Sequence, residues 1–160
     1  LDDYDGDVSV GLSETRAELG FGAVRLTSKL IDGTFPDYTR VIPAGNDRIM
    51  QVDAASFSAA VDRVSTISSE KSRSVKMGLK SGVLTLSASN TDASSATEEI
   101  EVTYGGPEMD IGFNARYLLD IAGQVNNDIV EFALADQGSP SLVRAPGDDA
   151  SLFVLMPMRV

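Results

Sequence analysis

Binding chemistry is concentrated at the C-terminus of the chain. Two methionines flank a proline in the last seven residues, Val154-Leu155-Met156-Pro157-Met158-Arg159-Val160. Methionine side chains are unbranched and polarizable, so a pair of them forms a surface that adapts to apolar groups. Proline interrupts a strand ladder and fixes the backbone, so the methionines need not both turn inward. Taken alone, the segment fits a last core strand with a frayed end at least as well as an apolar binding surface.

Catalytic chemistry has few candidates in these 160 residues, which include no His and no Cys. The absence of His removes the most common general base and zinc ligand, and the absence of Cys removes disulfides and thiolate metal sites. No G-x-S-x-G or P-loop pattern is present. The sequence therefore predicts a protein that is not an enzyme and that needs no cofactor or metal.

A second unusual segment runs from Asp32 to Pro43 and reads DGTFPDYTRVIP. Asp-Gly is a strong turn signal, and each proline favours extended backbone at the residue before it. Two aromatic residues and an arginine lie between these stiff positions. The segment predicts a rigid linker between two packed units, with some apolar surface left exposed.

Together, the two segments resemble the bacterial beta sliding clamp, the beta subunit of DNA polymerase III. FPDYxRVIP-like linkers and a terminal MPMR recur in that family. The similarity runs along essentially the whole chain, including TSKLIDG at 27–33 and IGFN at 111–114. It implies the end of a second clamp domain over 1–35, a linker over 36–47 and a third clamp domain over 48–160.

The resemblance also implies a function. The chain would be a fragment of a DNA polymerase processivity factor, part of a ring that encircles and slides on double-stranded DNA without sequence specificity. An apolar groove between the second and third domains would bind peptides of the replicative polymerase, the clamp loader and repair proteins. The residues that match this groove are Pro36, Arg40, Val41, Asn114, Tyr117, Val154, Met156, Pro157, Met158 and Arg159.

Two further sites follow from the resemblance. Cations on or after the two predicted helices would line the DNA-facing lumen, and each has a solvated helix face as its alternative: Arg63, Lys71, Arg73 and Arg116. Thr66 and Ile67 would lie at the ring interface, although Ile67 also fits a core stripe. The full-length subunit would form a head-to-tail homodimer, and this fragment would be monomeric.

The net charge of −11 bears on the DNA partner. A protein that binds DNA by affinity normally carries a basic surface, because neutralisation of phosphates supplies much of the free energy. A topologically linked ring needs no such affinity. The acidic balance also suits the alternative function, a stand-alone peptide-binding adaptor with no DNA role. The lack of Cys and of any membrane-length apolar run predicts a cytoplasmic location and no membrane partner.

An internal duplication organises the chain from about Arg48 onward. Short strands over 49–52 and 109–113 are each followed by a capping residue, Asp53 or Asn114, and then by apolar residues at helical spacing. Adding 61 to Asp53 or to any of the first four positions of the first stripe gives its counterpart in the second half. The first stripe comprises Phe57, Ala60, Val61, Val64 and Ile67, and the second Leu118, Ile121, Ala122 and Val125.

Three strands follow each predicted helix, over 74–80, 83–89 and 97–104 and then over 129–135, 141–144 and 151–156. The predicted fold class is α+β, with duplicated strand-helix-three-strand units and two helices packed on one face of antiparallel sheets, as in the DNA clamp fold. Alternating residues over 7–12, 16–21 and 23–31 predict a partial β meander in front. This meander is too small for an independent core, so we expect the sequence to be a piece of a longer chain.

Overall fold

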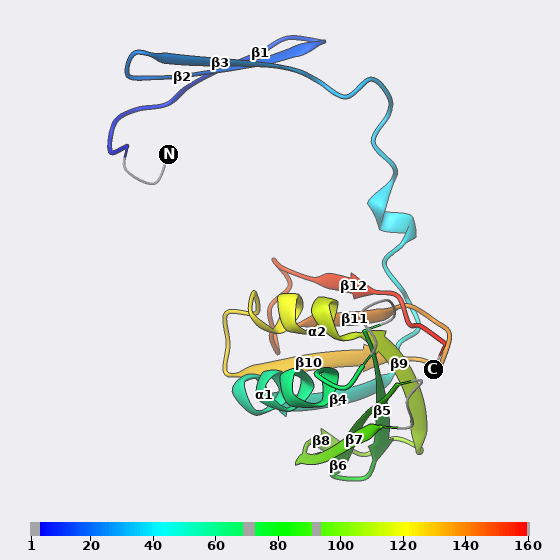
Figure 1. Cartoon of the computed structure of the whole chain (residues 1–160). Coiled ribbons are helices and arrows are strands. Elements are labelled where there is room, and N and C mark those ends of the chain that lie inside the picture. Colours follow the sequence, from blue (N-terminus) through cyan, green and yellow to red (C-terminus); the bar gives the residue numbers. More distant parts are fainter. Residues whose placement is uncertain (1–3, 69–72, 91–93, 160) are drawn as a thin grey trace. The chain divides into compact units, whose positions relative to one another are not determined.

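The computed structural model describes residues 4–68, 73–90 and 94–159. The chain divides into two compact units, Leu1–Asp37 and Tyr38–Val160. The first unit holds a three-stranded antiparallel sheet in the order β1-β2-β3 (Figure 1). Its strands are β1 (Ser9–Leu12), β2 (Arg16–Phe21) and β3 (Val24–Lys29). The predicted meander is therefore confirmed, with β1 and β3 slightly shorter than expected and β2 as predicted.

Apolar side chains share one face of this small sheet. The register pairs Leu19 with Val10 on one side and with Leu26 on the other. None of the described residues of this unit is buried. A three-stranded meander gains its stability mainly from what its apolar face packs against, so this sheet contributes no core of its own.

The second unit contains two antiparallel sheets and two helices (Figure 1). The five-stranded sheet has the order β12-β11-β10-β4-β8, and the four-stranded sheet has the order β7-β6-β5-β9. The strands are β4 (Arg48–Asp53), β5 (Ser74–Lys80), β6 (Val83–Ser89), β7 (Ser95–Glu101), β8 (Thr103–Tyr104), β9 (Met109–Asn114), β10 (Ile129–Leu134), β11 (Ser141–Arg144) and β12 (Phe153–Leu155). The helices are α1 (Ala54–Ser65), α2 (Ala115–Ala122) and the short 3-10 helix η1 (Tyr38–Arg40).

The two halves of this unit exchange their first strands. Strand β4 of the first half pairs with β10 of the second half, and β9 pairs with β5 of the first half. Each sheet therefore contains strands from both halves, and neither half can complete its sheet alone. The duplicated α+β fold predicted from the sequence is confirmed.

Equivalent hydrogen bonds start the two helices. The Asp53 carboxylate accepts from the Ser56 N–H at 2.8 Å, and the Asn114 amide oxygen accepts from the Arg116 N–H at 2.9 Å. Both are N-caps, which satisfy backbone donors that the first turn leaves without partners. Both capping predictions are confirmed.

The first residue of each helix also forms an equivalent backbone hydrogen bond. The Ala54 N–H donates to the Asp128 carbonyl at 2.7 Å, and the Ala115 N–H donates to the Arg73 carbonyl at 2.8 Å. Asp128 directly precedes β10, and Arg73 directly precedes β5. Each bond therefore fastens the start of a helix to the residue before an inner strand of the other half. The duplication therefore extends to the way each helix is anchored.

The core lies between the helices and the sheets. Phe57, on α1, and Phe132, on β10, are almost fully buried, with ring centroids 5.4 Å apart. The predicted stripe residues Val61 and Leu118 are also buried, whereas Ile67 lies beyond the last residue of α1 and is only half-buried. Burial of an aromatic or aliphatic side chain stabilises a fold by about 1.5–3 kcal/mol, so these residues hold the helices on the sheets.

One predicted strand is wrong in detail. The segment over 97–104 divides at Val102 into β7 and β8, which join different sheets. The Val102 N–H donates to the Gly82 carbonyl at 3.1 Å, and the Gly82 N–H donates to the Tyr104 carbonyl at 3.2 Å. These bonds to the β5–β6 turn hold the chain where it crosses from one sheet to the other.

Candidate functional site

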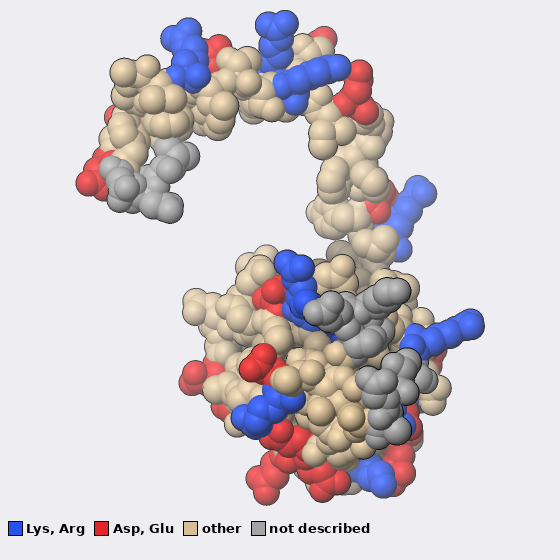
Figure 2. Space-filling view, in the orientation of Figure 1, with Lys and Arg blue, Asp and Glu red and all other residues tan. Residues whose placement is uncertain are grey.

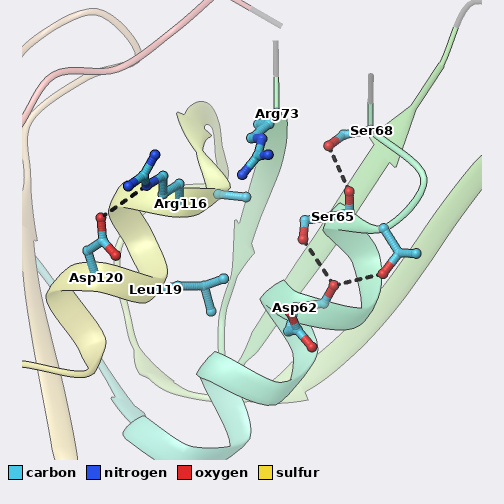
Figure 3. Close-up of a pocket in the computed structure, with 9 residues that line it drawn as sticks. Asp62, Ser65, Ser68, Arg73, Arg116, Leu119 and Asp120 are labelled. Carbon is cyan, nitrogen blue, oxygen red and sulfur yellow. Dashed lines mark hydrogen bonds and ion pairs between the residues drawn. The ribbon is translucent and has the colours of Figure 1, made fainter. Parts of the chain in front are cut away.

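A cavity of about 320 Å³ opens between the two helices (Figure 3). It lies where the last turn of α1 faces the first turn of α2. Its lining combines two arginines, two aspartates and several hydroxyl side chains: Asp62, Ser65, Thr66, Ser68, Arg73, Ala115, Arg116, Leu119 and Asp120.

The hydroxyl groups of this cavity already donate to the backbone. Ser65 Oγ and Thr66 Oγ1 donate to the Asp62 carbonyl at 3.0 and 3.1 Å. Ser68 Oγ donates to the Ser65 carbonyl at 2.8 Å. They satisfy carbonyls that the end of α1 leaves without partners. A ligand at this cavity would therefore receive its hydrogen bonds from the two guanidinium groups.

The charges in the cavity balance. Arg73 and Arg116 supply +2, and Asp62 and Asp120 supply −2, so the sum is zero. Arg116 Nε lies 3.8 Å from Asp120 Oδ2, and both side chains are more than half exposed. An exposed pair of this kind is weak and exchanges readily with other partners. The cavity can therefore contact an anion such as a phosphate, but only weakly.

The predicted lumen and interface residues separate into three groups. Arg73, Arg116 and Thr66 come together in the cavity between the helices. Arg63 instead points to β7, where its Nε donates to Glu98 Oε2 at 3.0 Å. This hydrogen bond raises the pKa of Arg63 and lowers the pKa of Glu98. Lys71 lies outside the described residues.

The C-terminal segment forms the second candidate site. Leu155, the last residue of β12, is buried, whereas Met156 is 61% exposed. The Met158 N–H then donates to the Gly112 carbonyl of β9 at 2.8 Å. A cleft of about 600 Å³ lies beside this segment, and we call it the tail cleft. Its lining residues are Lys76, Asp110, Ile111, Gly112, Gln137, Gly138, Pro157, Met158 and Arg159.

The predicted linker reaches this region through the loop between β10 and β11. Asn46 Nδ2 donates to the Ala133 carbonyl at 2.8 Å and to the Pro140 carbonyl at 2.9 Å, one on each side of that loop. The same loop contributes Gln137 and Gly138 to the tail cleft. The linker end and the tail are thus connected by one loop.

A carboxylate inside this loop fixes its shape. Asp136 Oδ1 accepts from the Gly138 N–H at 2.8 Å and from the Ser139 N–H at 2.7 Å. These hydrogen bonds favour the charged carboxylate, so they lower the pKa of Asp136. The sequence interpretation did not single out Asn46 or Asp136. An Asp-x-Gly-Ser run is an ordinary turn signal, and nothing in it indicates a binding site.

The other predicted groove residues lie on different elements. Val41, directly after η1, is 60% exposed, and Tyr117, on α2, is 56% exposed. Val154 is half-buried on β12, and the Asn114 amide is used as the cap of α2. Arg40 belongs to η1, and Pro36 belongs to the first unit.

Comparison with known families decides the relationship. The family described as "DNA polymerase III beta subunit, C-terminal domain" matches residues 39–159. The chain belongs to this family. The resemblance inferred from the linker and the tail is confirmed.

Relatives of the clamp family extend beyond this match. The beta sliding clamp of Caulobacter vibrioides is 52% identical over 153 residues, covering 96% of this chain and 41% of the relative. The clamp of Pseudomonas aeruginosa is 39% identical over 160 residues, covering all of this chain and 44% of the relative. The chain therefore spans about two fifths of the length of these relatives.

Solved clamp structures share the fold. The clamp of Bartonella birtlesii bound to griselimycin has a TM-score of 0.92 and 51% identity, covering 99% of this chain and 43% of that chain. A Caulobacter crescentus clamp with bound polyethylene glycol has a TM-score of 0.94 and 50% identity, with the same coverage.

No helix in the described part of the chain has the length and apolar character needed to cross a bilayer.

Proposed function

We propose that the chain is the C-terminal part of a non-enzymatic, cytoplasmic processivity factor for the replicative DNA polymerase. Residues 1–35 would form the end of the second clamp domain, 36–47 the linker and 48–160 the third domain. The complete subunit would assemble head to tail into a ring around duplex DNA. The observation that carries the proposal is the family match over 39–159, which includes both helices and the tail.

The cavity between the helices supports a sliding contact with DNA. A protein that must move along DNA benefits from contacts that reach phosphates but exchange quickly. Two exposed arginines balanced by two aspartates have this property. Two phosphate contacts would give a salt-dependence slope of only about −1.8 on a log-log scale. A sequence-specific binder normally has many more such contacts.

The exposed apolar residues of the second unit support a peptide groove. Tyr38, Val41, Tyr117 and Met156 are each more than half exposed, although apolar side chains of this size favour burial. Leucine or phenylalanine anchors of a partner peptide would cover such surface, each contributing about 1.5–3 kcal/mol when fully buried. The ligands would be extended segments of the polymerase, the clamp loader and repair proteins.

The edge of the four-stranded sheet supports the ring interface. Strand β7 is at the edge of this sheet, and α1, which precedes Thr66 and Ile67, packs against it. An edge strand carries backbone groups that can pair with another chain. Thr66, Ile67 and the backbone edge of β7 would together meet the neighbouring subunit.

Charge reversal tests the DNA contact. We would graft this chain into the corresponding part of the Caulobacter vibrioides clamp and introduce Arg73→Glu with Arg116→Glu. We expect slower loading onto circular DNA and shorter retention, with an unchanged circular dichroism spectrum. The matched control is Arg25→Glu with Lys29→Glu, which changes the net charge equally outside the helix cavity. Equal retention of the two double variants would refute the proposed track.

Methionine truncation tests the groove. Met156→Ala with Met158→Ala should weaken binding of a C-terminal peptide of the Caulobacter vibrioides replicative polymerase by about tenfold or more in calorimetry. Leu152→Ala, which truncates another exposed apolar residue before β12, should leave the affinity unchanged. An unchanged affinity of the double methionine variant would remove the tail from the groove.

A further inference from the structure

The outer face of the four-stranded sheet contains a trough of about 570 Å³. One row of residues crosses all four strands, because Gly78 pairs with Asp110 on β9 and with Thr85 on β6, and Thr85 pairs with Glu99 on β7. Gly78 has no side chain, so the middle of this row is low. We call the surface from Asp110 to Glu99 the sheet trough.

The sheet trough is continuous with the tail cleft. Lys76, Asp110 and Gln137 line both of them. Lys76 Nζ lies 2.8 Å from Asp110 Oδ2. This ion pair lines the place where the trough and the cleft meet. A chain that leaves the tail cleft beside Met158 can therefore follow the trough across the sheet.

The far end of the trough is acidic. Acidic side chains gather over the part of the second unit where β6, β7 and β8 lie (Figure 2). The two trough lysines already face carboxylates, Lys76 with Asp110 at 2.8 Å and Lys80 with Glu108 at 4.0 Å. Glu99 accepts a hydrogen bond from Thr85 at 3.4 Å, and within the described part of the chain no cation pairs with it. A basic group is the complementary partner for this carboxylate.

We propose that the sheet trough binds the part of a partner polypeptide that adjoins the residues held in the tail cleft, with a Lys or Arg side chain opposite Glu99. This inference rests on the proposed function, since it extends the same peptide groove. Three strand spacings of about 4.8 Å separate β9 from β7, and an extended chain advances about 3.3 Å per residue, so about four to five residues cross the trough. The lining has three carboxylates and two lysines, so its net charge of −1 disfavours a nucleic acid as the occupant.

Extended peptides test the proposal. The probe is the polymerase C-terminal peptide of Caulobacter vibrioides, alone or lengthened by five residues ending in Lys on its N-terminal or its C-terminal side. We expect one of the extensions to tighten binding to the 160-residue chain about three- to fivefold at low salt in fluorescence anisotropy, since an exposed ion pair is weak. Replacing the terminal Lys by Glu should abolish this gain.

Variants locate the gain. Glu99→Lys should remove it while leaving the affinity for the short peptide unchanged. The matched control, Glu101→Lys, makes the same charge change two residues further along β7 but outside the trough lining, and should retain the gain. Gly78→Thr should also remove it by filling the floor, where an added Cβ would lie 3.2 Å from the movable Asp110 carboxylate.

The outcomes separate the two levels of inference. Binding of the short peptide with no gain from either extension, or a gain that survives Glu99→Lys, overturns the sheet trough and leaves the tail cleft in place. Failure of the short peptide to bind overturns both the groove and its extension.

Discussion

The duplicated helix caps provide a test in which one half of the molecule controls for the other. Asp53 and Asn114 occupy equivalent positions, and each accepts one backbone N–H at nearly the same distance, 2.8 and 2.9 Å. Only Asp53 can be titrated. Asp53→Ala and Asn114→Ala should therefore destabilise the second unit by similar amounts at pH 7 but respond differently to acid.

The magnitudes follow from the geometry. Loss of a neutral N-cap typically costs about 1 kcal/mol, which is the expected effect of Asn114→Ala. The hydrogen bonds from Ser56 lower the pKa of Asp53 below its ordinary value of 3.8. A carboxyl whose pKa is lowered in the folded state contributes stability that is complete above the unfolded pKa and is lost as the pH falls through the folded pKa. The cost of Asp53→Ala should therefore shrink below about pH 4, while that of Asn114→Ala stays constant.

Urea unfolding followed by circular dichroism between pH 7 and pH 3 measures both differences. Asp53→Asn serves as the control, because it retains a cap oxygen and removes the titration. It should show the wild-type stability at pH 7 with a smaller dependence on acid. Equal pH dependence of the two alanine variants would refute the assignment of Asp53 as a charged cap.

Three other changes test buried and loop contacts. Ser141→Ala should raise the unfolding free energy by about 1 kcal/mol, since its hydroxyl is fully buried and has no hydrogen-bond partner among the described residues; a loss of stability in urea unfolding would contradict this. Asn46→Ala should cost about 1–2 kcal/mol by leaving two carbonyls without their donor, and calorimetric peptide binding should weaken with it. Asp136→Ala should likewise reduce peptide affinity at pH 7. Because the pKa of Asp136 is lowered, the affinity of the wild-type protein should fall towards that of the variant only below about pH 4. Equal affinities at pH 7 would argue against a role for this loop.

The sequence predicted the features that local pattern determines. Asp53 and Asn114 start helices because each is followed by an apolar stripe at helical spacing, and the 61-residue offset applies to both. Alternation of apolar and polar residues located β5 and β6 to the residue. The tail and linker motifs were specific enough to indicate the family.

Long-range pairing limited the remaining predictions. The exchange of β4 and β9 between the halves, and the division at Val102, depend on which strands meet in space, and alternation along one strand carries no such information. Arg63 pairs with Glu98, a carboxylate 35 positions away, and no local pattern indicates this partner. Asn46 acts through two carbonyls, which belong to every residue alike and leave no sequence signal.

The duplication also explains why the tail is open. Thr103 pairs with Gln51, and Met158 forms a bridge with Gly112, which is Gln51 shifted by 61. Thr103 and Met158 are therefore equivalent, and so are the residues before them, Val102 and Pro157. In the first half the Val102 N–H holds the crossing segment to Gly82, but a proline has no N–H to donate. The first half therefore continues into β8 with Tyr104 buried, whereas the described residues of the second half form one bridge at this edge. The residue before this position is exposed in both halves, but it is Glu101 in the first and Met156 in the second, so only the tail presents an apolar side chain there to a partner.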